Sequence, residues 1–111
     1  EPESYLAAMA SVYAACERML RPGGYTVLVT KNLRAEGSLR NLAGDTISLC
    51  LRAGLSFQQH IVALLAAVRD DELVPRPSYF QLMHIRHAGA RGERMHLVCH
   101  EDVLVFQKPP A

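Results

Sequence analysis

Apolar residues recur at helical spacing over the first twenty positions of the chain. Leu6, Met9, Val12 and Cys16 fall on one stripe, and Ser4 precedes them as a residue type that caps helix N-termini. The spacing predicts an amphipathic helix ending near Leu20. The letters R-P-G-G follow at 21–24, where proline cannot continue a helix and glycine tolerates positive φ.

The next pattern is a β-branched and apolar run from Tyr25 to Val29, which predicts a strand suited to burial on both faces. Thr30, Lys31 and Asn32 follow directly at the carboxyl end of this strand. In open α/β sheets ligands bind at the carboxyl ends of strands. We therefore take these three residues as candidate substrate-binding residues at a functional rim.

The middle of the chain alternates between polar and apolar segments. Residues 33–40 are polar and predict a loop, and residues 43–51 carry a helical stripe that Gly54 ends. Residues 61–68 are continuously apolar, which periodicity alone does not assign, but the flanking glycine and charged turn favour a strand. A clearer strand spans Val103 to Phe106. The order predicts an α/β fold.

A long segment, about 69–95, separates these last two strands and predicts an inserted loop or subelement within a single domain, 1–111. Arg76, Tyr79 and Phe80 are held there by two prolines and could meet a phosphate and stack on an extruded base. The alternative is a hydrophobic lid packed on the core. After these residues we expect a strand at 81–86 and a glycine-rich basic turn at 88–94.

Composition narrows the class of protein without identifying it. The 111 residues are 50% hydrophobic and carry a formal charge of +1. Basic character is therefore local, concentrated in Arg69, Arg76, Arg86, His87, Arg91 and Arg94. The three cysteines form no C-x-x-C pair, and we expect buried reduced thiols in a cytoplasmic protein. No run is long and apolar enough to span a membrane, and no signal peptide is expected. The histidine spacings lack the partners of a metal site, and no P-loop, G-x-S-x-G or G-x-G-x-x-G occurs.

Three segments together resemble a known family. They are residues 20–30 with R-P-G-G before a strand, the P-R-P-S-Y-F-Q-L segment at 75–82, and H-E-D-V-L-V-F-Q-K at 100–108. The chain is similar over nearly all its length to the carboxyl-terminal half of a Rossmann-like class I S-adenosylmethionine-dependent methyltransferase. The more restrictive segments resemble the site-specific DNA methylases of restriction-modification systems, which modify adenine N6 or cytosine N4.

The resemblance also implies what this sequence lacks. The family binds S-adenosylmethionine at an early glycine-rich turn and holds the target amine with a D/S-P-P-Y/F/W motif, and neither motif occurs here. No residue therefore inherits a catalytic or cofactor-binding role. The implied protein is part of a DNA amino-methyltransferase, inactive alone, whose complete form uses S-adenosylmethionine and binds DNA. Half of an RNA or small-molecule methyltransferase, and a non-enzymatic α/β interaction module, remain open.

The implied sheet order also predicts a partner. The strand at 25–29 would have the final strand on one side and a strand from the missing half on the other. We expect that edge to be covered by the missing amino-terminal half or by a second copy of the chain.

Overall fold

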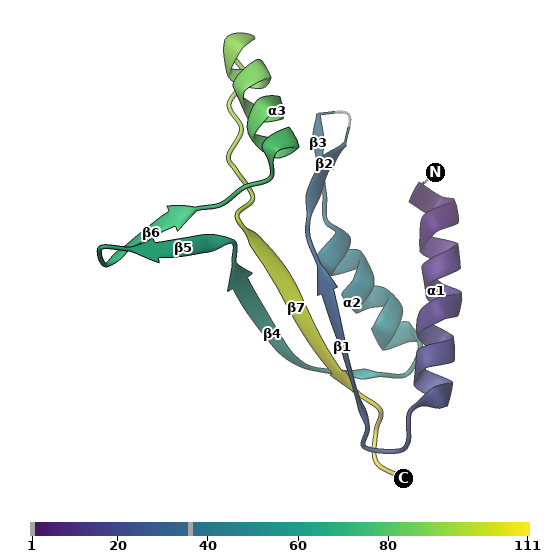
Figure 1. Ribbon diagram of the computed structural model, residues 1–111. Coiled ribbons are helices and arrows are strands. Elements are labelled where there is room, and N and C mark those ends of the chain that lie inside the picture. The colour runs from purple at the N-terminus through teal and green to yellow at the C-terminus, as the bar shows by residue number, and fades with distance from the viewer. Residues whose placement is uncertain (1, 36) are drawn as a thin grey trace. The chain divides into compact units, whose positions relative to one another are not determined.

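The computed structural model describes residues 2–35 and 37–111 (Figure 1). The chain divides into two compact units, which are described separately. The first contains Glu1–Val62 and Asp102–Ala111, and the second contains Ala63–Glu101. The segment expected to be an insertion lies within the second unit.

The first unit contains both long helices and the main sheet. Its elements are α1 (Pro2–Met19), β1 (Tyr25–Thr30), β2 (Leu33–Ala35), β3 (Ser38–Arg40), α2 (Leu42–Arg52), most of β4 (Ser56–Leu64) and most of β7 (His100–Gln107). The two predicted helices and the two clearest predicted strands are confirmed. Gly54 follows the end of α2 with a φ of 99°, as a left-handed residue that ends a helix should.

The main sheet has the strand order β1-β7-β4. β1 and β7 run antiparallel, with Val27 opposite Val105 and Thr30 opposite Asp102. The last strand is therefore the antiparallel neighbour of β1, as the sequence predicted. Among the described residues β1 has no strand on its other side. Its free edge is the one for which we expected a partner.

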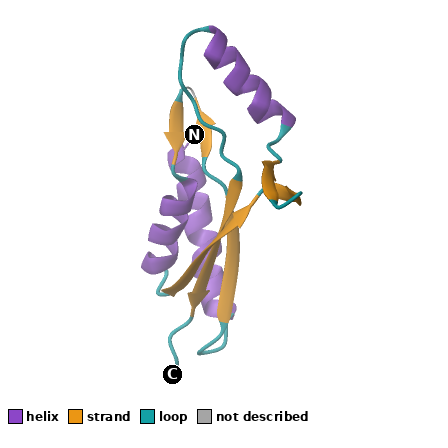
Figure 2. Cartoon of the chain, turned by 90° about the vertical axis from the view of Figure 1, so that its left-hand side faces the viewer, coloured by secondary structure: helices purple, strands orange, loops and turns teal. Residues whose placement is uncertain are grey.

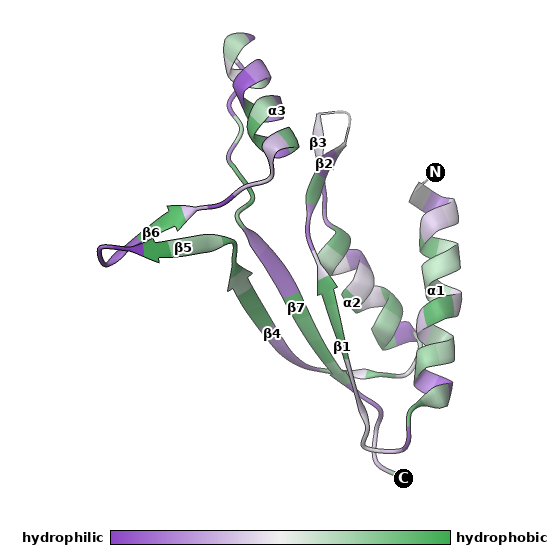
Figure 3. Ribbon diagram, viewed as in Figure 1, coloured by the Kyte–Doolittle hydropathy of each residue, from purple (hydrophilic) through white to green (hydrophobic). Residues whose placement is uncertain are grey.

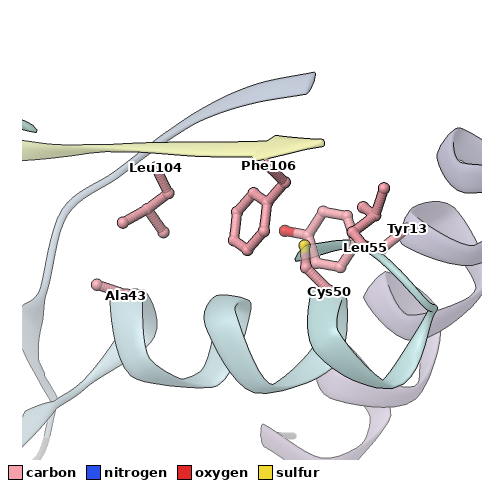
Figure 4. Packing of buried hydrophobic residues seen from close by; sticks show 6 residues of the cluster. All are labelled: Tyr13, Ala43, Cys50, Leu55, Leu104 and Phe106. Atoms are coloured by element: carbon pink, nitrogen blue, oxygen red, sulfur yellow. The ribbon is translucent and has the colours of Figure 1, made fainter. Parts of the chain in front are cut away.

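The core of the first unit lies between this sheet and α2. Leu104 and Phe106 project from β7 toward α2 and are fully buried, as is Cys50 on that helix (Figure 4). Tyr13 enters the same cluster from α1, and the aromatic ring of Phe57 stacks on Phe106 with 5.1 Å between centroids. Both helices therefore cover a single face of the sheet (Figure 2).

The other face of β1 is uncovered. Tyr25, Val27 and Val29 alternate with inward residues and are 59%, 55% and 59% exposed, and Figure 3 shows how apolar this strand is. In the register, Val105 and Val103 lie opposite the two valines and share their face. We call the surface formed by these five residues the open sheet face. A patch of this kind is typical of a surface that another layer covers.

The second unit contains a hairpin and a helix. The hairpin consists of β5 (Ala66–Arg69) and β6 (Glu72–Pro75), paired antiparallel, and the helix is α3 (Tyr79–Ala90). Asp70 and Asp71 form the hairpin turn with φ values of 50° and 64°. Positive φ at both central residues is the conformation of a tight hairpin turn. The charged turn predicted at this position is therefore the tip of the β5–β6 hairpin.

Two local predictions were wrong, and the strand favoured at 61–68 is confirmed only in part. Residues 33–40 were expected to form a loop but form the β2–β3 hairpin, whose short strands carry no periodic signal and whose turn contains Gly37 at a φ of 81°. The guanidinium carbon of Arg40 lies 5.4 Å from the ring centroid of Tyr5, which ties β3 to α1. The apolar run at 61–68 is divided between β4 and β5, with Leu65 in neither strand.

The other wrong prediction concerns residues 81–94. The strand expected at 81–86 is part of α3, which continues through Ala90 and so takes in the start of the basic turn expected at 88–94. Ser78 begins the helix by accepting a hydrogen bond from the backbone N–H of Gln81.

None of the helices, over the described part of the chain, is long and apolar enough to cross a membrane.

Candidate functional site

The predicted rim residues lie where β1 ends. Thr30 is directly opposite Asp102 of β7, and the side chains of paired residues share one face of the sheet. The hydroxyl oxygen of Thr30 is buried, and no described residue forms a hydrogen bond with it. A buried hydroxyl without a protein partner commonly meets a water or another group. Thr30 therefore keeps hydrogen-bonding capacity at the rim, beside the partly buried Lys31.

Asn32 already has partners within the protein. Its Oδ1 accepts a hydrogen bond from the backbone N–H of Ala43 at 2.9 Å, and its Nδ2 donates to Oδ1 of Asn41 at 3.2 Å. Asn41 in turn accepts from the backbone N–H of Gly44 at 3.0 Å and caps α2. A Cβ at Gly44 would lie 2.5 Å from the amide nitrogen of Asn41, so glycine leaves room for this cap. In this structure Asn32 holds the start of α2 in place.

A polar pair on the same sheet was not predicted from the sequence. Nε2 of His60 lies 2.9 Å from Oδ1 of Asp102, whose side chain is only 6% exposed, while the side chain of His60 is 41% exposed. A carboxylate that hydrogen-bonds one ring nitrogen fixes the orientation of an imidazole. The pair therefore presents an oriented histidine at the surface of the first unit.

Two side-chain contacts join β4 to the inward face of β7. Phe57 stacks on Phe106, and His60 bonds to Asp102, although the two residues are three apart on β4 and their partners are four apart on β7. Residues three apart on a regular strand point to opposite faces, yet the rings of Phe57 and His60 are neighbours, with centroids 6.2 Å apart. The one available sequence signal was Asp102 itself, because alternation places it on the inward face with Leu104 and Phe106.

The other three candidates belong to the second unit. Arg76 is exposed, and Tyr79 and Phe80, at the start of α3, are 68% and 84% exposed. The two rings meet edge to face, with 5.8 Å between centroids. Side chains this exposed are not packed within the second unit. Their π-faces are open to a stacking partner.

The candidates thus form two groups. Thr30, Lys31 and Asn32 gather with Asp102 and His60 in the first unit, and Arg76, Tyr79 and Phe80 gather in the second. Among the described residues, no group of three or more histidine, cysteine, aspartate or glutamate side chains could hold a metal ion.

Comparison with known proteins finds solved structures with a similar fold. No protein-family model matches the sequence, and no curated protein sequence matches it. Two crystal structures of a proposed DNA modification methylase from Thermus thermophilus do match. The selenomethionine form has a TM-score of 0.70 at 17% identity, over 98% of this chain and 38% of that chain. The form complexed with S-adenosyl-L-methionine has a TM-score of 0.66 at 18% identity, with the same coverage.

The expected resemblance is therefore confirmed at the level of fold. The chain has a mixed α/β fold like that of part of the matched chains and spans 38% of their length.

Proposed function

We propose that this chain is the carboxyl-terminal part of an S-adenosylmethionine-dependent DNA amino-methyltransferase that modifies adenine N6 or cytosine N4. The observation that carries the proposal is the match of 98% of the chain to part of a proposed DNA modification methylase. The order β1-β7-β4, with an antiparallel last strand, and the three family-like sequence segments support it.

The residues of this chain do not fit a cofactor site. The sequence has no glycine-rich turn between a strand and a helix, and no D/S-P-P-Y/F/W motif. The helix that follows β1 offers no substitute, because side chains already cap the backbone N–H groups of Ala43 and Gly44. The amide donors that bind phosphate or carboxylate groups at helix N-termini are thus occupied. Cofactor and catalytic groups must come from elsewhere, and the chain alone is inactive.

In this proposal the chain supplies the substrate side of the enzyme. Thr30 and Lys31 would face the reaction site from the end of β1, and Tyr79 and Phe80 would pack against a base taken out of the duplex, with Arg76 on a phosphate. Stacking of a base on an aromatic side chain contributes about 1–3 kcal/mol.

The open sheet face would be covered by the rest of the methyltransferase fold or, in its absence, by a second copy of the chain. Sheets of α/β domains carry covering layers on both faces, whereas this sheet carries helices on one.

Two measurements test the proposal. Calorimetric titration of the chain with S-adenosylmethionine should give no binding heat, and a micromolar dissociation constant would show that the chain does hold a cofactor site. In the complete enzyme, Tyr79→Ala and Phe80→Ala should lower methylation of duplex DNA while leaving cofactor affinity unchanged. Full methylation of DNA by both variants would remove these aromatics from the substrate site.

A further inference from the structure

One side of α3 contacts the segment 91–99, which connects the helix to β7. Ala88 is fully buried on this side. The side-chain amide of Gln81 donates to the backbone carbonyl of Val98 at 3.0 Å and accepts from the backbone N–H of the same residue. A paired amide of this kind fixes the rotation of the helix about its axis. Positions of α3 that do not face this segment remain exposed, as the accessibility of the side chains shows.

Next to the packed side, α3 carries an exposed stripe of an aromatic residue followed by basic ones. Phe80, His84, His87 and Arg91 are spaced i, i+4, i+7 and i+11, so they form one stripe along the helix. All four are exposed. We call them the exposed α3 face. Arg76 and Tyr79 stand at the start of the helix, so cations and aromatic rings run along about 18 Å of it.

Negative charge is nearly absent from this part of the chain. The acidic residues Asp70, Asp71 and Glu72 gather in the β5–β6 hairpin, and Glu93 is the one acidic residue between 76 and 100. Its carboxylate accepts a hydrogen bond from Nε of Arg91 at 3.1 Å, and this bond and the charge of Arg91 lower the pKa of Glu93. Glu93 thus masks one cation of an otherwise basic face.

We propose that the exposed α3 face, together with Arg76 and Tyr79, binds a single strand of nucleic acid, with cations on the phosphates and aromatic rings on the bases. Exposed rings can stack only on bases whose own faces are free, which favours an unpaired strand over a duplex. This inference rests on the proposed function, because Arg76, Tyr79 and Phe80 belong to both sites, but the binding needs no methyl donor and is measured apart from methyl transfer.

Fluorescence anisotropy with the full 111-residue chain tests the proposal. The probes are a labelled oligonucleotide as a single strand and the same sequence as a duplex, titrated without S-adenosylmethionine at several salt concentrations. The single strand should bind more tightly than the duplex. Phe80→Ala should weaken single-strand binding about tenfold, since a stacked ring is lost.

Substitutions that remove one charge, on the exposed α3 face and outside it, provide matched variants. Arg91→Gln should weaken binding and lower the salt slope by about 0.7, the value for one phosphate contact on a single strand. Glu93→Gln removes the competing carboxylate and should strengthen binding. Arg69→Gln makes the same charge change in the hairpin, beside Asp70, and should leave the affinity within about twofold, as expected for a cation outside the site.

Three results would overturn the proposal. The first is that the single strand and the duplex bind with equal affinity and Phe80→Ala has no effect. The second is that Arg69→Gln and Arg91→Gln lose equal affinity, and the third is that neither the wild type nor Glu93→Gln binds at low salt. Phe80 is 84% exposed, so its removal should not unfold the chain, and an unchanged circular dichroism spectrum verifies this.

Discussion

Raising the pH should destabilise the first unit through a single thiol. Cys50 lies on α2 and is fully buried among Tyr13, Leu55 and Phe106. Burial disfavours the thiolate and raises the pKa of Cys50 from 9.0 to about 11, with a smaller contribution from Cys16. The folded protein therefore holds this proton more tightly than the unfolded chain.

The sign and the size of the effect follow from linkage. A raised pKa contributes stability that is fully present below pH 9 and is lost as the pH rises toward 11. One pH unit within that window corresponds to about 1.4 kcal/mol, so stability should fall by on the order of 1 kcal/mol between pH 8 and pH 10. The pKa of Tyr13 is also raised, chiefly by burial, and adds to the loss above pH 10.

Urea unfolding followed by circular dichroism, in the presence of a reducing agent, measures this loss. The control is Cys50→Ala, which lacks the titrating group but keeps the other ionisable side chains, so the thiol accounts for the difference between the two pH dependences. The wild type should lose about 1 kcal/mol more than the variant between pH 8 and pH 10. Equal losses would mean that Cys50 is not buried as a protonated thiol in the native state.

Three further changes test the hairpin, the α3 packing and the open sheet face. Asp71→Gly relieves a φ of 64° and should stabilise the β5–β6 hairpin by up to about 1 kcal/mol in thermal unfolding, whereas Glu72→Gly, within β6, should destabilise it. Gln81→Ala removes both hydrogen bonds to Val98 and should speed exchange of the Val98 amide by at least about tenfold, since each bond contributes about 1 kcal/mol. We expect the wild type to self-associate and Val27→Thr to weaken that association in light scattering, and a wild type that stays monomeric at high concentration would refute the expectation.

The elements that could be predicted are those whose sequence carries a strong local signal. β1 is a β-branched run bounded by a glycine turn, and α2 has a clear apolar stripe with Gly54 at its end. α3 was missed because its residues form no marked apolar stripe. A signal was present in Ser78 and Gln81, which have the spacing of a capping box, although the side chain of Gln81 bonds to Val98 instead of closing that box.

The sequence predicted where candidate site residues lie but not what each side chain does, because that depends on contacts between residues distant in the sequence. Thr30 and Asn32 lie at the rim where the strand pattern placed them, yet the amide of Asn32 is engaged by Ala43 and Asn41. His60 and Asp102 are 42 residues apart in the sequence, and no local pattern indicates that they meet.

The apolar surface of the main sheet is distributed unevenly between its two faces. Leu104 and Phe106 on one face of β7 are fully buried by the helix layer, whereas Val27 and Val29 on the opposite side of the sheet remain more than half exposed. A strand that is apolar on both faces gains stability from two covering layers, and this sheet has one. The matched methylase chains are longer and contain the present fold in 38% of their length. The valines of the open sheet face are therefore where a completing layer of the same fold would gain the most by packing.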